Sequence, residues 1–171
     1  MRRFSLLLVI FFSICFQSFA HIGHYNNLNY LEYELFRNNK PIGYHKYYFK
    51  RENDNLEIKS EVGFNITKLG VNIYKYKADS NEYYEKDKFL SFSAKTLQNK
   101  KEKYVNIKYQ KDKNNLLIDG SSYKGDADIN FIVGTWWNHE IIDAKAQISA
   151  VSGRIIHQKV NFLGKKQINI N

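Results

Sequence analysis

Apolar and polar residues alternate with a period of two along most of the chain, and turn-forming residues interrupt the alternation about every ten residues. The segment over 56–66 shows the pattern best, because Leu56, Ile58 and Val62 alternate there with charged side chains. Such alternation is typical of half-buried strands. It predicts strands over residues 30–37, 42–51, 56–66, 71–84, 89–97, 103–110 and 116–119. The long segment over 71–84 is either one bent strand or two short strands.

The segments between these expected strands are short, so neighbouring strands should pair antiparallel as a meander. The alternation puts apolar side chains on one face of the sheet and polar side chains on the other. A sheet of this many strands must curl to cover its apolar face. We therefore predict a mainly β fold, an antiparallel meander curled into a barrel or half-barrel.

The last third of the chain lacks this alternation. Residues 121–130 are polar and contain Gly125, which predicts a loop. Asn138 can cap a helix, so we predict one short helix near residues 138–147. Residues 148–163 then predict a closing hairpin around a Ser152-Gly153 turn.

The N-terminus has the features of an export signal. Two arginines precede an apolar stretch over residues 4–16, and small residues follow, which predicts a signal peptide over residues 1–20 that is cleaved after Ala20. A retained membrane anchor is the alternative, although this run is shorter than the ~20 residues that span a bilayer. The mature protein is then exported, to the periplasm or beyond as a secreted protein, as a single β-rich domain over residues 21–171. The single cysteine, Cys15, falls in the signal peptide, so a disulfide scaffold is excluded.

The charge of the chain narrows the classes of partner. The formal net charge is +9, because 26 basic residues outnumber 17 acidic ones. Of the basic residues, 21 are lysines and only five are arginines. Nucleic-acid sites favour arginine, because its planar guanidinium contacts phosphate and guanine through two hydrogen bonds. The lysines alternate with apolar residues on expected strand faces, so we expect no nucleic-acid partner. An exported basic protein is instead expected to make loose contact with anionic membrane surfaces.

Several short motifs resemble those of one family. The residues Tyr-Glu-Leu-Phe-Arg-Asn-Asn-Lys-Pro-Ile-Gly-Tyr-His at 33–45 resemble the opening hairpin of a family of exported bacterial proteins, domain of unknown function 6134. Residues 73–76 and 89–91 are similar to its middle segment, and Trp137-Asn138 followed by 152–154 is similar to its later motifs. The resemblance covers about residues 29–165 and implies export and a β architecture, with no reaction attached. Members continue with further strands, so the resemblance also implies that this chain lacks the C-terminal strands.

His45 is the histidine with the clearest candidate chemistry. It lies in the middle of an expected strand, close to Gly43, where a backbone segment or a ligand can approach closely. Pairing with Glu32 or Glu34 on the neighbouring strand would bury and orient its imidazole. The interpretation that we favour is a cross-strand hydrogen bond that fixes the register. No complete catalytic set accompanies it, and we expect no metal and no cofactor.

Aromatic side chains give the strongest remaining signal. Tyrosines concentrate in the central strands, and Trp136-Trp137 follows a glycine in an expected loop. Adjacent residues of an extended chain point in opposite directions, so one tryptophan can fill the core while the other faces solvent or a ligand. We expect most of these aromatic residues to belong to the core. The residues that we predict to bind a ligand are His45, Tyr47, Tyr74, Tyr76, Trp136 and Trp137.

The sequence is compatible with three functions. We favour an exported, non-catalytic protein that binds a hydrophobic or amphipathic envelope molecule, such as a lipid or an acyl chain. The alternative is a structural or interaction protein in envelope assembly. A weaker alternative is a hydrolase that uses His45 and a nearby acid.

Overall fold

The computed structural model describes residue 25 and residues 27–165. The predicted signal peptide over residues 1–20 and its cleavage site after Ala20 lie outside these residues. Within the described part of the chain, no helix is long and apolar enough to cross a membrane.

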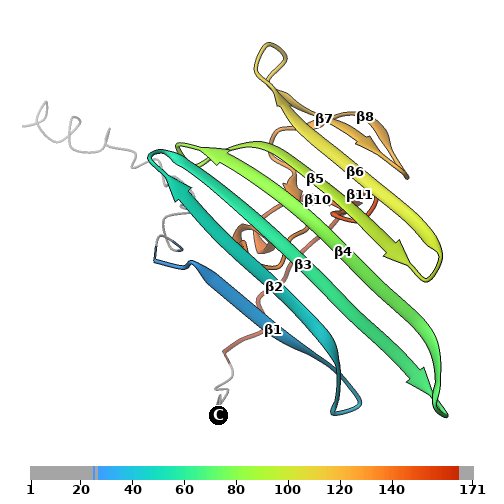
Figure 1. Cartoon of the computed structure of the whole chain (residues 1–171). Helices are drawn as coiled ribbons and strands as arrows, with labels where there is room; N and C mark the ends of the chain where they lie inside the picture. The colour runs from blue at the N-terminus through green and yellow to red at the C-terminus, as the bar shows by residue number, and fades with distance from the viewer. Residues whose placement is uncertain (1–24, 26, 166–171) are drawn as a thin grey trace, which may run out of the picture.

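Eight strands form one antiparallel sheet in which each strand pairs with the next along the chain (Figure 1). They are β1 (Tyr30–Arg37), β2 (Lys40–Glu52), β3 (Asn55–Lys68), β4 (Val71–Glu85), β5 (Lys88–Gln98), β6 (Lys101–Gln110), β7 (Asn115–Gly120) and β8 (Lys124–Asp128). The predicted meander is therefore confirmed, and the segment over 71–84 forms one long strand. The β1–β2 turn is tight because Asn38 and Asn39 adopt the left-handed backbone that two-residue hairpin turns require.

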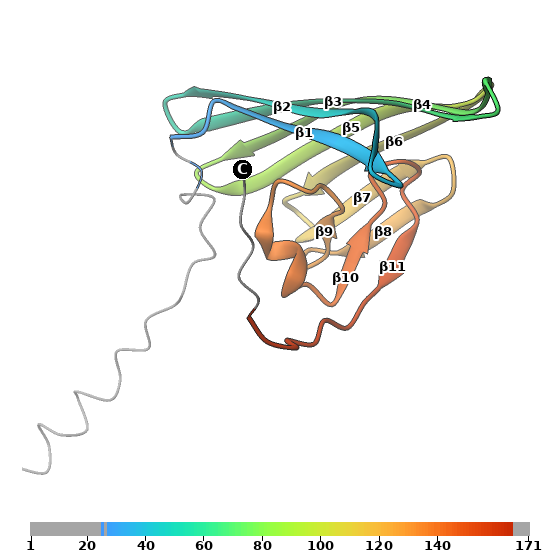
Figure 2. The same ribbon diagram turned by 90° about the horizontal axis from the view of Figure 1, so that it is seen from below.

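The sheet does not close into a barrel. Within the described residues, β1 and β8 form its two edges and do not pair with each other. The sheet instead curls over a second layer, which covers part of its concave face (Figure 2). This layer contains β9 (Ile132–Val133), β10 (Ala146–Ile148) and β11 (Ile155–His157), with β10 paired to both of the others. The mainly β fold class is confirmed, but the barrel is not closed, because a separate layer supplies the apolar cover that closure would supply.

The helix predicted near residues 138–147 is much shorter than expected. Only His139–Ile142 is helical, as the 3₁₀ helix η2, and the side-chain oxygen of Asn138 caps it by accepting the Glu140 N–H at 3.0 Å. Residues 146–148 form β10 instead. Pairing with strands on both sides therefore outweighs the helical tendency of this segment.

Two further expectations for the last third of the chain also change. The loop expected over 121–130 contains β8, whose Lys-Gly-Asp-Ala-Asp sequence has a low strand propensity and is held by pairing with β7. The hairpin around Ser152-Gly153 is present as β10 and β11, although its strands are shorter than expected. Gly120 permits its close packing, because a Cβ there would lie 2.5 Å from the carbonyl oxygen of Ser152.

The core lies between the concave face of the sheet and the second layer, and it forms two clusters. The cluster beneath β5 to β8 includes Phe92, Val105, Ile107, Leu116, Ile118 and Ile148. The cluster beneath β2 to β4 consists of Tyr47, Phe49, Leu56, Ile58, Tyr84 and Trp137. Partly buried Phe89 packs against both clusters. The alternation of the strands thus aims every second side chain at one continuous apolar layer.

Candidate functional site

A cavity of about 350 Å³ lies on the concave face of the sheet, beside the margin of the second layer. Strands β1 to β5 form one side of it, and residues 134–136 and 150–151 form the other. Its aromatic lining residues are Tyr47, Phe64, Tyr76 and Trp136, and we call this cavity the aromatic groove. No described side chain that lines the groove is an aspartate, glutamate, lysine or arginine.

His45 projects from β2 into the groove. Its Nε2 lies 2.9 Å from the Ser60 hydroxyl oxygen on β3, and its ring centre is 4.2 Å from that of Tyr47. Burial lowers the pKa of His45 to about 4, so the imidazole is neutral at pH 7. The two strands approach closely here, because a Cβ at Gly43 would lie 2.0 Å from the carbonyl oxygen of Gly63. The close approach expected next to His45 is therefore present.

His45 does not pair with Glu32 or Glu34, the carboxylate partners that we considered. The register of β1 and β2 places Tyr33 opposite His45, so Glu32 and Glu34 point to the convex face of the sheet. There Glu32 forms an ion pair with Lys46 at 3.5 Å. The contact with Ser60 is instead a cross-strand hydrogen bond, which is the interpretation that we favoured.

Tyr47 lines the groove and anchors the loop that carries Trp136. Its side chain is only 1% exposed, and burial raises the pKa of its hydroxyl above the ordinary value. The hydroxyl oxygen accepts the backbone N–H of Trp136 at 3.2 Å. This bond ties the loop before η2 to the sheet, while the Trp136 indole stays 77% exposed at the groove.

Trp137 points away from the groove and is 2% exposed. Its ring packs edge-on against Phe49 and Tyr84, with centroid distances of 5.7 and 6.0 Å. The indole N–H donates to a carboxylate oxygen of Glu82 at 2.9 Å, and the Tyr84 hydroxyl donates to the other oxygen at 2.5 Å. Burial raises the pKa of Glu82 to about 7, although the two hydrogen bonds act in the opposite direction and lower it. The tryptophan pair therefore splits between the core and the groove.

The two predicted tyrosines of β4 both face the concave side. Tyr76 lines the groove and stacks on Phe64, with a centroid distance of 4.9 Å and an interplanar angle of 15°. Tyr74 lies 5.9 Å from Phe64 and is not among the lining residues. It extends the aromatic surface from the groove toward the β3–β4 turn.

The structure thus brings four of the predicted residues together, namely His45, Tyr47, Tyr76 and Trp136. Sequence reasoning missed Ser60 as the hydrogen-bond partner of His45, although the alternation of β3 puts it on the concave face with Ile58. It also missed Glu82, which shares a face with Tyr84 by the same rule. A glutamate in an apolar position of the alternation is the signal that could have identified it.

The groove offers polar groups but little acid–base chemistry. A serine hydroxyl next to a histidine is the arrangement that activates a nucleophile. Here the imidazole is a weak base at pH 7, and no carboxylate contacts it within the described residues. Among those residues, no three or more histidine, cysteine or acidic side chains gather in a way that could hold a metal ion.

Comparison with known proteins gives one match. Neither the curated proteins nor the solved structures contain a match to this chain. A family model described as Domain of unknown function (DUF6134) matches residues 33–171, which include every residue that lines the groove. The resemblance noted from the opening hairpin is therefore confirmed, and the chain belongs to this family.

Proposed function

We propose that this protein binds a hydrophobic or amphipathic molecule, such as a lipid or an acyl chain, in the aromatic groove and does not convert it chemically. The observation that carries the proposal is a cavity of about 350 Å³ between four aromatic side chains. One of these, Trp136, is 77% exposed although its backbone is tied to the sheet. An exposed indole on an anchored backbone, beside a cavity, is a ready contact surface for an apolar ligand.

The lining defines the class of ligand. The polar groups that it offers, including those of His45, Ser60 and Thr135, are neutral at pH 7. A charged head group would lose its hydration there without gaining a partner of opposite charge. The volume is near the lower end of the ~300–1,000 Å³ that ligand pockets span. A single acyl chain with a neutral hydroxyl-bearing head group fits these conditions best.

Titration with a short-chain monoacylglycerol below its critical micelle concentration tests the proposal. Isothermal titration calorimetry on the wild type should detect saturable binding. Replacing Trp136→Ala removes a wall of the groove, and Ala78→Leu fills its floor, so each should weaken binding at least about tenfold. The matched control is Leu117→Ala, which truncates a side chain 39% exposed outside the groove and should bind as the wild type does.

Two results would contradict the proposal. One is an absence of binding by the wild type. The other is an equal affinity of the wild type and both groove variants. A stable complex with a protein partner that forms equally well with the Ala78→Leu variant would favour the alternative role in envelope assembly.

The contact between Ser60 and His45 favours a second candidate, hydrolysis of an ester held in the groove. The Ser60 hydroxyl oxygen would attack the ester carbonyl carbon while His45 accepts its proton. His45 would return that proton to the departing alcohol as the ester bond breaks, and water would then release the acid from Ser60. The low pKa of His45 makes this candidate weaker than binding. Release of p-nitrophenol from an acyl ester that is lost in Ser60→Ala, with monoacylglycerol binding retained, would support it. The absence of turnover by the wild type would exclude it.

A further inference from the structure

The two ends of the large sheet differ in charge. The turns β1–β2, β3–β4 and β5–β6 lie at one end, toward the lower right of Figure 1, and the other turns of β2 to β7 lie at the opposite end. We call residues 36–42, 66–77 and 97–103 the distal end and residues 49–57, 83–90 and 109–117 the proximal end. The distal end carries eight basic side chains and one acidic side chain, whereas the proximal end, of equal residue number, carries six of each. The basic side chains of the distal end are Arg37, Lys40, Lys68, Lys75, Lys77, Lys100, Lys101 and Lys103.

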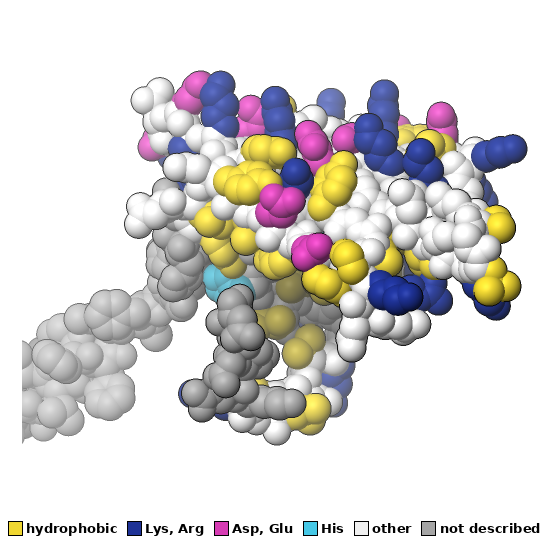
Figure 3. Space-filling model, turned by 60° about the horizontal axis from the view of Figure 1, so that its bottom comes forward, with side chains coloured by type: hydrophobic (Ala, Val, Ile, Leu, Met, Phe, Trp, Pro, Cys, Tyr) yellow, Lys and Arg dark blue, Asp and Glu magenta, His cyan; other side chains and the backbone are white. Residues whose placement is uncertain are grey.

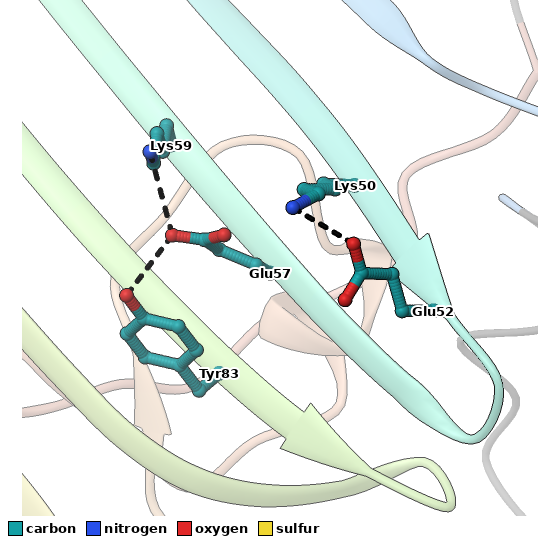
Figure 4. Close-up of polar contacts among 5 residues, drawn as sticks. All are labelled: Lys50, Glu52, Glu57, Lys59 and Tyr83. Atoms are coloured by element: carbon teal, nitrogen blue, oxygen red, sulfur yellow. Dashed lines mark hydrogen bonds and ion pairs between the residues drawn. The ribbon is translucent and has the colours of Figure 1, made fainter.

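The positive charge of the distal end is not neutralised by ion pairs. Within the described residues, Lys77 with Asp79 at 3.5 Å is the one ion pair that involves any of these eight side chains. At the proximal end, by contrast, Lys50 pairs with Glu52 at 2.8 Å (Figure 4). Near it, Glu57 contacts Lys59 at 3.6 Å and accepts the Tyr83 hydroxyl at 2.9 Å. The electrostatic field is therefore more positive at the distal end than at the proximal end.

Large apolar side chains are exposed among these lysines. Leu69 is 95% exposed, Val71 63% and Ile73 51%, and all three belong to the β3–β4 hairpin. Figure 2 shows this hairpin reaching past the second layer, and Figure 3 shows hydrophobic and basic side chains together at the same end of the molecule, at the right of the view. The tip of the longest hairpin is thus apolar, and basic side chains follow it on both of its strands, Lys68 on β3 and Lys75 on β4.

Leu69 occupies a backbone conformation that does not suit a leucine. Its φ is 50° and that of Gly70 is 77°, which is the left-handed pair that a two-residue hairpin turn requires. Asparagine is favoured at the first of these positions, and five of the eight non-glycine residues with positive φ are asparagines. Leu69 is the apolar one among those eight. Among the described residues nothing covers Leu69, which is 95% exposed, so neither packing nor local turn stability explains its presence.

The neighbouring turn is fixed beside this hairpin. The Asn99 backbone N–H donates to the Lys75 carbonyl oxygen at 2.7 Å, and the Asn99 side-chain oxygen accepts the Lys75 N–H at 2.8 Å. These two bonds hold the β5–β6 turn, with Lys100, against β4. The lysines of this turn therefore lie beside β4, at the same end of the sheet as the hairpin tip.

We propose that the distal end docks onto an anionic membrane surface, with Leu69 and Val71 entering the head-group region and the surrounding lysines contacting lipid phosphates. Apolar side chains at the tip, with lysines further back on the same hairpin and on the neighbouring turn, match the two layers of such a surface, because aliphatic groups gain contact with acyl chains while ammonium groups stay at the phosphates. A nucleic acid offers phosphates but no apolar layer for exposed aliphatic side chains. The distal end also has a single arginine, the residue that phosphodiester recognition favours. This docking does not depend on a ligand in the aromatic groove.

Co-sedimentation with lipid vesicles tests the charge part of the proposal. The wild type should bind vesicles of phosphatidylcholine and phosphatidylglycerol, and binding should weaken with added salt and with less phosphatidylglycerol. The double variant Lys68→Gln/Lys100→Gln should bind about tenfold more weakly. Lys88→Gln/Lys111→Gln is the matched control, because it removes the same charge from exposed lysines of the proximal end and should stay within about twofold of the wild type.

A second pair of variants tests the apolar part. Leu69→Asn/Val71→Thr should weaken vesicle binding about tenfold while keeping or improving folding stability, because asparagine suits the backbone of position 69. Leu90→Ser/Leu117→Ser removes two leucines that are 38% and 39% exposed elsewhere on the molecule and should bind as the wild type does.

Three outcomes would overturn the proposal. The first is equal loss of binding in the distal and proximal lysine variants, because that shows attraction by net charge alone. The second is an unchanged affinity in Leu69→Asn/Val71→Thr. The third is tighter binding to duplex DNA than to the vesicles at the same salt concentration.

Discussion

The concave face of the sheet has a covered half and an open half, although the same strands build both. In the covered half, toward the proximal end, Phe49 and Tyr84 pack against Trp137 and are almost fully buried. In the open half, Phe64 and Tyr76 stack on each other and face the aromatic groove. Both pairs follow the same alternation along β2 to β4. The difference lies in what stands opposite them.

This difference comes from the lengths of the two layers. The central strands β2 to β4 have 13, 14 and 15 residues, whereas the longest strands of the second layer have three. At ~3.4 Å per residue, the sheet is far longer than the layer beneath it. Aromatic residues that no layer covers must meet solvent, a ligand or a partner. The open half is therefore where a binding function can be placed without disturbing the core.

Replacing each tryptophan singly with alanine should give the largest difference in stability between the two halves. Trp137→Ala should lower the free energy of unfolding by about 3–5 kcal/mol, because it leaves a cavity and removes a donor from buried Glu82. Trp136→Ala should cost about 0.5 kcal/mol, because the indole is 77% exposed. Urea denaturation followed by circular dichroism measures both values. Equal costs would show that the two halves are not distinct.

The pH dependence of stability should reveal one titrating group in each half. The pKa of Glu82 rises from 4.5 to about 7 on folding. Its stabilising contribution to the free energy of unfolding is therefore fully present below pH 4.5, and about 3 kcal/mol is lost as the pH rises to 7. The pKa of His45 falls from 6.5 to about 4, so its contribution is present above pH 6.5 and is lost as the pH falls to 4. The slopes of the free energy of unfolding against pH that these two groups produce have opposite signs, so they offset each other between pH 4.5 and 6.5.

Single variants should isolate the pH dependence of stability that each group produces. With Glu82→Gln, stability should rise with pH between 4 and 6.5, because only the His45 slope remains. With His45→Asn, stability should fall as the pH rises from 4.5 to 7. Urea midpoints measured across this range provide the test. A slope of the same sign in both variants would contradict the burial that we assign to these groups.

A smaller effect is expected where the two halves join. Tyr47→Phe removes the oxygen that accepts the Trp136 N–H, which should cost about 1 kcal/mol of stability and weaken monoacylglycerol binding. The control is Tyr109→Phe, which removes a hydrogen bond of similar length to Asn114 at an exposed site and should change neither quantity measurably. Unchanged binding in Tyr47→Phe would show that the groove does not need a fixed Trp136 backbone.

Local pattern was sufficient to predict seven of the eight strands of the large sheet. The alternation of Leu56, Ile58 and Val62 identified β3 and its buried face, and the asparagines of the tight turns indicated the antiparallel meander. Both features depend on neighbouring residues alone. The strand β8 was missed because its sequence carries no such pattern and its pairing with β7 decides its structure.

Long-range contacts decided what the sequence could not predict. Whether β1 pairs with β8 depends on how much apolar surface another segment covers, and no local pattern reports that. The same limit applies to the site. His45 and the tyrosines were identifiable as candidates, but the partner Ser60 follows from the register of β2 and β3, and the burial of Glu82 follows from Trp137, 55 residues away.

The central claim is that the open half binds an apolar ligand and the covered half does not. The chain has two tryptophans, so the indole N–H region of a ¹H–¹⁵N correlation spectrum holds one signal from each half. Titration with the monoacylglycerol should shift the Trp136 signal to saturation and leave the Trp137 signal in place. A spectrum in which neither signal moves, or in which only the Trp137 signal moves, would contradict the claim.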